Sequence, residues 1–138
     1  MSDFVLDASL ALQWFLDDEG DRKYSLSVLA ALSEKRATVP ILWLYEVGNG
    51  LLMAYRRKRI SLQQVEEFIS RLKALPIDVA EQNIADIFGL PAFAAAHGLT
   101  NYDAAYLAVC LQKDLPLATT DSKLRQVAGL TGVRPIVV

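Results

Sequence analysis

The feature that most constrains the fold is an alternation of short apolar runs with longer segments of helical period. The apolar runs have the length of strands and cover residues 4–6, 37–39, 77–80, 115–119 and 135–138. The segments between them repeat apolar residues at helical spacing over 10–16, 24–32, 42–55, 62–75, 84–96 and 102–111. Strands separated by helices pair in parallel, and the helices then cover both faces of the sheet. The pattern therefore predicts a three-layer α/β/α sandwich around a central parallel sheet of about five strands.

Composition limits the class of protein further. With 138 residues, 53% apolar and 22% charged, the chain has the size and balance of one globular domain, which we expect to span residues 1–138. Cys110 is the lone cysteine, and neither a signal-like start nor a run of membrane length is present, so we expect a cytoplasmic protein. An acidic stretch over residues 17–21 is interpreted as a solvated loop. The net charge of −2 excludes a globally basic nucleic-acid binder, so a nucleic-acid ligand would need local positive charge.

Helix boundaries are marked by capping residues. Ser61 followed by Gln64 has the spacing of a capping box, and Thr100 with Asp103 has the same spacing. Gly98 follows the end of the helix predicted over 84–96, where a left-handed residue commonly stops a helix.

Two carboxylates follow predicted strands. Asp7 ends the first apolar run, and Asp121 follows the fourth. Ligands of open parallel sheets bind beyond the carboxyl ends of the strands, near the point where the strand order reverses. If these two strands are neighbours, both side chains face one crevice.

Two more carboxylates lie on apolar helices. Glu46 lies within the apolar segment 41–47, and helical spacing places it on one face with Leu42, Asn49 and Met53, so we expect it to interrupt a buried stripe. Asp103 begins a helix of almost wholly apolar composition, whose N-terminus would hold it towards the crevice.

Each acid also has a structural interpretation. Asp7, Asp103 and Asp121 are all at positions where they could cap a helix. Glu46 has no such role, and a buried carboxylate without a partner is rare. Carboxylates that converge repel one another unless a cation lies among them, and oxygen ligands suit Mg²⁺ or Mn²⁺. Such an ion commonly meets a phosphate, which suggests metal-activated hydrolysis of a phosphodiester.

At these residues the chain resembles the PIN-domain family, and within it the VapC-type toxins of toxin–antitoxin pairs. The matching segments are FVLDAS (4–9), YEVGNGL (45–51), YDAAYLA (102–108) and TTDSKL (119–124), in the order of the family's four acidic motifs. The resemblance implies a sheet in the order 3-2-1-4-5, Mg²⁺- or Mn²⁺-dependent cleavage of RNA, a VapB-type antitoxin that inhibits it, and a homodimer.

Roles carried over from the family fall on matching positions of this chain. The metal ligands and catalytic acids would be Asp7, Glu46, Asp103 and Asp121. Ser9 and Thr120 would orient ligands or substrate, and Asn49 would be a partner of Glu46.

One dense basic run ends the helix that carries Glu46. It consists of Arg56, Arg57, Lys58 and Arg59, which could contact RNA or could simply complement the helix dipole at a solvated surface. For the antitoxin, we expect an apolar helix against residues 42–75 and an arginine placed among the acids.

An alternative of another class is a non-catalytic, metal-dependent adhesion module. Such modules begin Asp-x-Ser-x-Ser, and Asp7-Ala8-Ser9 satisfies the first half of that pattern. This interpretation leaves Glu46 unexplained.

Overall fold

Parallel strands at the centre of the molecule are separated by helices, as the alternation of the sequence predicts. The computed structural model describes residues 3–16 and 22–137, so the acidic stretch at 17–21 lies outside the described residues. In chain order the elements are β1 (Phe4–Leu6), α1 (Ala8–Leu12), α2 (Lys23–Ala31), β2 (Ala37–Val39), α3 (Leu42–Arg56), α4 (Leu62–Lys73), β3 (Ile77–Val79), α5 (Ile84–Phe88), α6 (Leu90–His97), α7 (Asn101–Lys113), β4 (Leu117–Ala118) and α8 (Ser122–Leu130).

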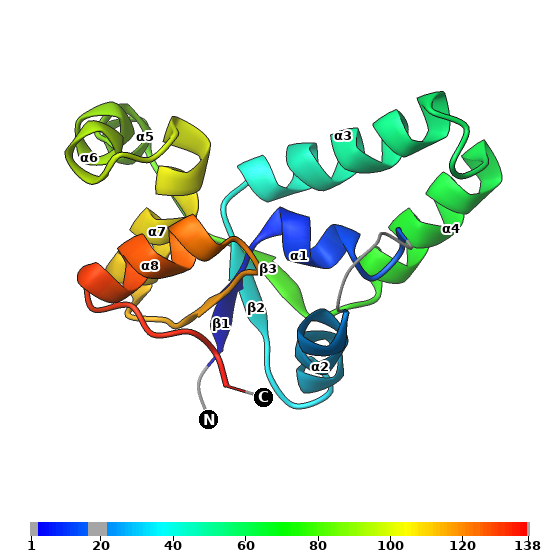
Figure 1. The fold of residues 1–138 in the computed structure, drawn as a ribbon, viewed down its shortest axis with the longest axis horizontal. Helices are drawn as coiled ribbons and strands as arrows, with labels where there is room; N and C mark the ends of the chain where they lie inside the picture. Colours follow the sequence, from blue (N-terminus) through cyan, green and yellow to red (C-terminus); the bar gives the residue numbers. More distant parts are fainter. Residues whose placement is uncertain (1–2, 17–21, 138) are drawn as a thin grey trace.

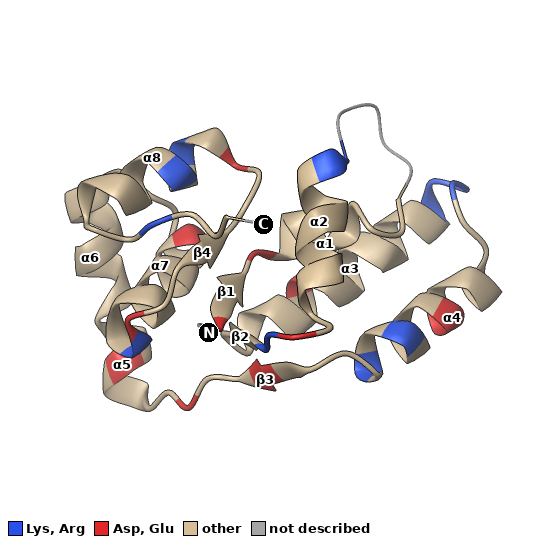
Figure 2. Cartoon of the chain, turned by 90° about the horizontal axis from the view of Figure 1, so that it is seen from below, with Lys and Arg blue, Asp and Glu red and all other residues tan. Residues whose placement is uncertain are grey.

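The sheet has the strand order β3-β2-β1-β4, and every pairing in it is parallel. In both overall views, α1, α2 and α3 lie on one side of the sheet while α6, α7 and α8 lie on the other (Figures 1 and 2). The three residues of β1 are fully buried, because helices cover both of its faces. The predicted α/β class and layering are therefore confirmed.

The last apolar run does not form a regular strand. Leu117 donates its N–H to the carbonyl oxygen of Arg134 at 2.9 Å and accepts the N–H of Ile136 at 3.0 Å, so this segment lies beside β4. The pairing remains a single parallel bridge between Leu117 and Pro135, and the described sheet has four strands where about five were predicted.

Packing of α3 against α1 fixes how the two elements cross. The buried side of α3 carries Trp43, Val47, Leu51 and Ala54, at the spacing of one helical face. Gly50 lies close to α1, since a Cβ at this position would be 2.5 Å from Cδ1 of Leu12. The absence of a side chain here allows the two helices to approach closely.

The predicted helix boundaries are mostly confirmed. Ser61 and Gln64 form the expected capping box, the Thr100 hydroxyl accepts the N–H of Asp103 at 3.0 Å, and Gly98 ends α6 with φ of 64°. The segment predicted as one helix over 84–96 is two helices, α5 and α6, separated at Gly89. Pro91 explains the break, because its ring is tolerated in a first turn and not in a helix interior. Across residues 3–16 and 22–137, every helix is too short or too polar to span a bilayer.

Candidate metal centre at the carboxyl ends of the strands

The carboxylate of Asp7 lies at the carboxyl end of β1 and is 7% exposed. Asp7 precedes α1, but its side chain makes no capping hydrogen bond to that helix. Its Oδ2 atom instead accepts hydrogen bonds from two hydroxyl groups, those of Ser9 and Thr119, each at 2.7 Å. Ser9 therefore contacts the acid, and capping does not explain why an acid stands at position 7.

Beyond β4, Thr119 joins the two acids that follow strands. The pairing of Leu6 with Ala118 brings the ends of β1 and β4 side by side. Thr119 is 1% exposed, donates its hydroxyl to Asp7, and accepts the backbone N–H of Asp121 at 3.0 Å. Thr120, for which the sequence predicts an orienting role, is exposed, whereas its neighbour Thr119 is the buried residue that contacts Asp7, because faces alternate along an extended chain.

Asp121 caps α8, as the structural interpretation allowed. Its Oδ1 atom accepts the N–H of Leu124 at 3.0 Å, and the residue itself is exposed. This contact uses one carboxylate oxygen, and the charge of Asp121 helps to raise the pKa of Asp103. Capping and participation in an acidic centre are therefore compatible at this residue.

Glu46 is half-buried on the side of α3 next to its buried face. The expected stripe of Leu42, Glu46, Asn49 and Met53 is thus wrong by about one position, which rotates the buried face by about 100°. Among the described residues the carboxylate accepts a hydrogen bond from the hydroxyl of Tyr106, at 2.5 Å, and from no other side chain. Asn49, the expected partner, is exposed and makes no hydrogen bond to Glu46.

Electrostatic interactions link the four acids. Burial raises the pKa of Glu46, and the charges of Asp7 and Asp103 raise it further, while the Tyr106 hydrogen bond opposes the shift. Burial likewise raises the pKa of Asp103, followed by the charges of Asp121 and Asp7. Lys123, in the first turn of α8, acts in the opposite direction on Asp103. Glu46 and Asp103 therefore each interact with Asp7, and Asp121 joins this set of acids through Asp103.

The donor chemistry of this group fits a hard divalent cation. Asp7, Glu46 and Asp121 are each held through one carboxylate oxygen, and the second oxygen has no hydrogen bond within the described part of the chain. Oxygen ligands of this kind are those that Mg²⁺ and Mn²⁺ prefer. As the side chains stand, no three His, Cys, Asp or Glu residues of 3–16 and 22–137 are arranged to hold an ion together.

The basic run lies at the other end of α3. Arg56 is ten residues beyond Glu46, which corresponds to about 15 Å along a helix axis. The run is exposed, and it coincides with the connection between α3 and α4, where Figure 2 shows basic residues away from the sheet. Lys123 and Arg125, on α8, are nearer to the acids. Arg125 donates to the carbonyl oxygen of Thr119 at 2.5 Å.

The strand order reverses between β1 and β4, and the acids lie at the carboxyl ends of these strands or on the helices beside them. Ligands of open α/β sheets generally bind at such a position. The model of the PIN domain family matches residues 4–130. The chain belongs to the PIN domain family. PIN domains are generally nucleases, so membership supports a hydrolase that acts on nucleic acid.

Solved structures share the fold at low sequence identity. A toxin–antitoxin complex from Klebsiella pneumoniae matches with a TM-score of 0.66 and 20% identity over 95% of each chain. PAE2754 from Pyrobaculum aerophilum matches with a TM-score of 0.64 and 21% identity, over 91% of this chain and 84% of that one. VapBC2 from Rickettsia felis, bound to a DNA fragment from its promoter, matches with a TM-score of 0.64 and 11% identity over 96% of each chain. No curated protein matches the chain.

Proposed function

We propose that this protein is a Mg²⁺- or Mn²⁺-dependent endoribonuclease and the toxin of a type II toxin–antitoxin pair. The observation that carries the proposal is the group of four interacting carboxylates, three of which are held through one oxygen only. Membership of the PIN domain family and the similarity to a toxin–antitoxin complex support it. A non-catalytic adhesion module would have no use for Glu46, which interacts with both Asp7 and Asp103.

The ligands would be Asp7, Glu46, Asp103 and Asp121. When bound, the cation supplies an activated water and neutralises charge on the phosphodiester that is hydrolysed. Ser9 and Thr119 fix one oxygen of Asp7, so that its other oxygen remains for the ion. Lys123 and Arg125 supply positive charge beside the acids, where they favour the approach of a phosphate to a chain of net charge −2. The run Arg56–Arg59 would meet more distant nucleotides of the same RNA.

RNA cleavage tests the proposal directly. Purified protein is incubated with total RNA and Mg²⁺, and new 5′ ends are mapped by sequencing. We expect defined cleavage sites that disappear with a chelator and in Asp7→Asn protein. Glu66→Gln, which removes an exposed carboxylate on α4, is the matched control and should cleave like the wild type. Cleavage that persists in the chelator, or equally in Asp7→Asn, would reject the metal-dependent nuclease.

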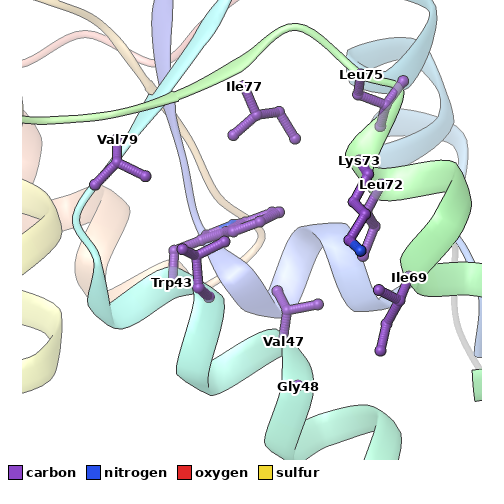
Figure 3. A pocket seen from close by; sticks show the side chains of 10 residues that line it. Trp43, Val47, Gly48, Ile69, Leu72, Lys73, Leu75, Ile77 and Val79 are labelled. Carbon is purple, nitrogen blue, oxygen red and sulfur yellow. The ribbon is translucent and has the colours of Figure 1, made fainter. Parts of the chain in front are cut away.

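An apolar groove beside α3 fits the antitoxin partner. It has a volume of about 270 Å³ and lies between α3, α4 and β3, and Leu44 is one of its lining residues. Trp43, Ile69 and Leu72 also line it (Figure 3). An apolar segment of the antitoxin would pack here, and an arginine from the same chain would pair with the acids and compete with the cation. Because the groove and Glu46 share α3, one partner can reach both.

Co-expression tests the partner. The protein is purified with the product of the adjacent small reading frame, and cleavage by the complex is compared before and after limited proteolysis of that product. We expect inhibition in the intact complex. Leu44→Asp, at the groove wall, should weaken the complex, whereas Leu62→Asp, equally exposed but outside the groove, should not. Full cleavage by an intact complex would reject inhibition by this partner.

A second apolar surface supports the proposed homodimer. Ile41, Tyr45, Ile87 and Tyr102 line a hollow between α3, α5 and the start of α7, and Phe88 beside it is 79% exposed. Large apolar side chains that remain exposed together mark a protein–protein contact. This apolar surface adjoins the helices that carry Glu46 and Asp103, so a second copy bound there would bring two acidic centres near each other.

A further inference from the structure

Tyr106 brings a hydroxyl group from the core to the acidic centre. The residue lies on α7 and is 1% exposed, and its ring is one of the largest fully buried side chains. Its hydroxyl nevertheless reaches the carboxylate of Glu46 and donates to Oε1 at 2.5 Å. The backbone amide of Ala8, the first residue of α1, faces the same phenol oxygen. The hydroxyl therefore lies where α7, α3 and α1 meet.

The carboxylate of Glu46 is held by one donor against the charges of two other acids. Its side chain has three rotatable bonds, it is half-buried, and the charges of Asp7 and Asp103 act on it from the crevice. Repulsion of this kind favours rotation of the carboxylate out towards water. Tyr106 is the only side chain in the described part of the chain that donates to it, and the packed ring cannot follow a rotation outwards.

Asp103 and Tyr106 both lie on α7 and both act on Glu46. Asp103 and Tyr106 are three residues apart and so occupy neighbouring positions on one face of the helix. That face presents to Glu46 one group that repels it and one that holds it. A phenylalanine at position 106 would fill the same core volume, so the hydroxyl is not explained by packing.

We propose that Tyr106 is a positioning residue for the metal centre, which holds Oε1 of Glu46 so that Oε2 remains for the cation. This proposal rests on the proposed function, since it assigns Tyr106 a role towards the ion that Glu46 would bind. Groups that orient metal ligands typically contribute 10- to 100-fold in metal affinity or activity. Tyr106→Phe isolates the hydroxyl, because it keeps the ring.

The test measures metal binding separately from catalysis. Mn²⁺ alone is titrated against wild-type and Tyr106→Phe protein, and the rise in thermal midpoint gives the half-saturating concentration. We expect that concentration to rise about 10-fold in Tyr106→Phe. In RNA cleavage we expect kcat to fall while KM stays within about twofold, because the hydroxyl positions a metal ligand and does not bind substrate.

Two controls separate positioning from general stability. Tyr24→Phe removes another, partly buried hydroxyl, which donates to the carbonyl oxygen of Ile136 at 2.9 Å, and keeps the ring against Arg125. We expect it to shift the metal-free midpoint and leave the half-saturating Mn²⁺ concentration unchanged. In a Glu46→Gln background, Tyr106→Phe should cause little further loss of Mn²⁺ binding, because both changes act on one ligand.

The outcomes are distinct. A wild-type Mn²⁺ response in Tyr106→Phe, an equal loss in the Glu46→Gln background, or a Tyr106→Phe chain that does not fold would each overturn the positioning role. No response to Mn²⁺ in the wild-type protein would instead overturn the proposed function, and the positioning role with it.

Discussion

Replacing Thr119 by valine should destabilise the fold, although valine has nearly the same shape and is more apolar. The hydroxyl of Thr119 donates to the carboxylate of Asp7 at 2.7 Å and accepts the N–H of Asp121 at 3.0 Å. Thr119 is 1% exposed and Asp7 is 7% exposed, so water cannot easily replace the lost donor at Asp7. The substitution therefore removes two contacts at the point where β1 and β4 end.

The size of the loss follows from these contacts. A hydrogen bond to a charged group contributes about 1.5–3 kcal/mol, and a buried polar group left without a partner costs about 1–3 kcal/mol. Because the exposed Asp121 can recover part of its bond from water, we expect Thr119→Val to lower the free energy of unfolding by about 2–3 kcal/mol. For a chain of this size that corresponds to a fall of roughly 6–15 °C in Tm.

Thr119→Ser is the matched control, because it keeps the hydroxyl and removes a buried methyl group. It should cost about 1 kcal/mol, near the value of one buried methylene. Urea and thermal unfolding in a chelator give both values. We expect the stability order wild type, then serine, then valine, and a smaller effect of valine in an Asp7→Asn background. A valine protein more stable than the serine protein would refute the reasoning, since apolar burial alone predicts that order.

Further predictions concern the metal, the acids, the second apolar surface and one ion pair. Millimolar Mg²⁺ or Mn²⁺ should raise Tm, by the equivalent of about 2.7 kcal/mol at a hundredfold excess over Kd, and scanning fluorimetry should show no rise in Asp7→Asn. Combining Asp7→Asn with Asp103→Asn should reduce RNA cleavage little beyond the worse single change, and multiplicative losses would argue against one shared centre. Phe88→Asp should weaken self-association in sedimentation experiments with an unchanged circular dichroism spectrum; an unchanged sedimentation coefficient would remove this surface from the dimer. Arg36 lowers the pKa of Asp78, so their ion pair stabilises the fold above the ordinary carboxyl pKa and loses that effect as the pH falls through the lowered value. Acid titration of Arg36→Gln should show a smaller loss of stability below about pH 4, and an identical acid profile would contradict this assignment.

The class of fold could be predicted because it depends on local patterns. The runs 4–6 and 37–39 form β1 and β2 at the predicted residues, since an uninterrupted apolar run suits a strand that is covered on both faces. The end of the chain was harder to predict, because a single bridge between Leu117 and Pro135 pairs it with β4 in the described part of the chain. The break at Gly89 was overlooked because the apolar spacing continues through it.

In the acidic centre, the sequence indicated the charged residues and not the groups that hold them. An acid at a strand end or in an apolar helix is conspicuous, so Asp7 and Glu46 could be found without coordinates. Tyr106 lies in an apolar helix, so the sequence alone indicates a core residue. The direction of its hydroxyl depends on how α7 packs relative to α3, which carries Glu46. Choosing Thr119 over its neighbour Thr120 requires the register of β4, which is set by pairing with β1.

The position of β4 in the sheet affects how the protein is made. β1 leaves the ribosome first, but the neighbour on one of its edges is β4, more than a hundred residues later in the chain. Contacts between such distant segments form late, because a long loop must close before they are made. Until then Asp7 has no Thr119 and no Asp121 beside it, so a partly synthesised chain lacks the acidic centre. Pairing of β4 with β1 is therefore required before Thr119 can hold the carboxylate of Asp7.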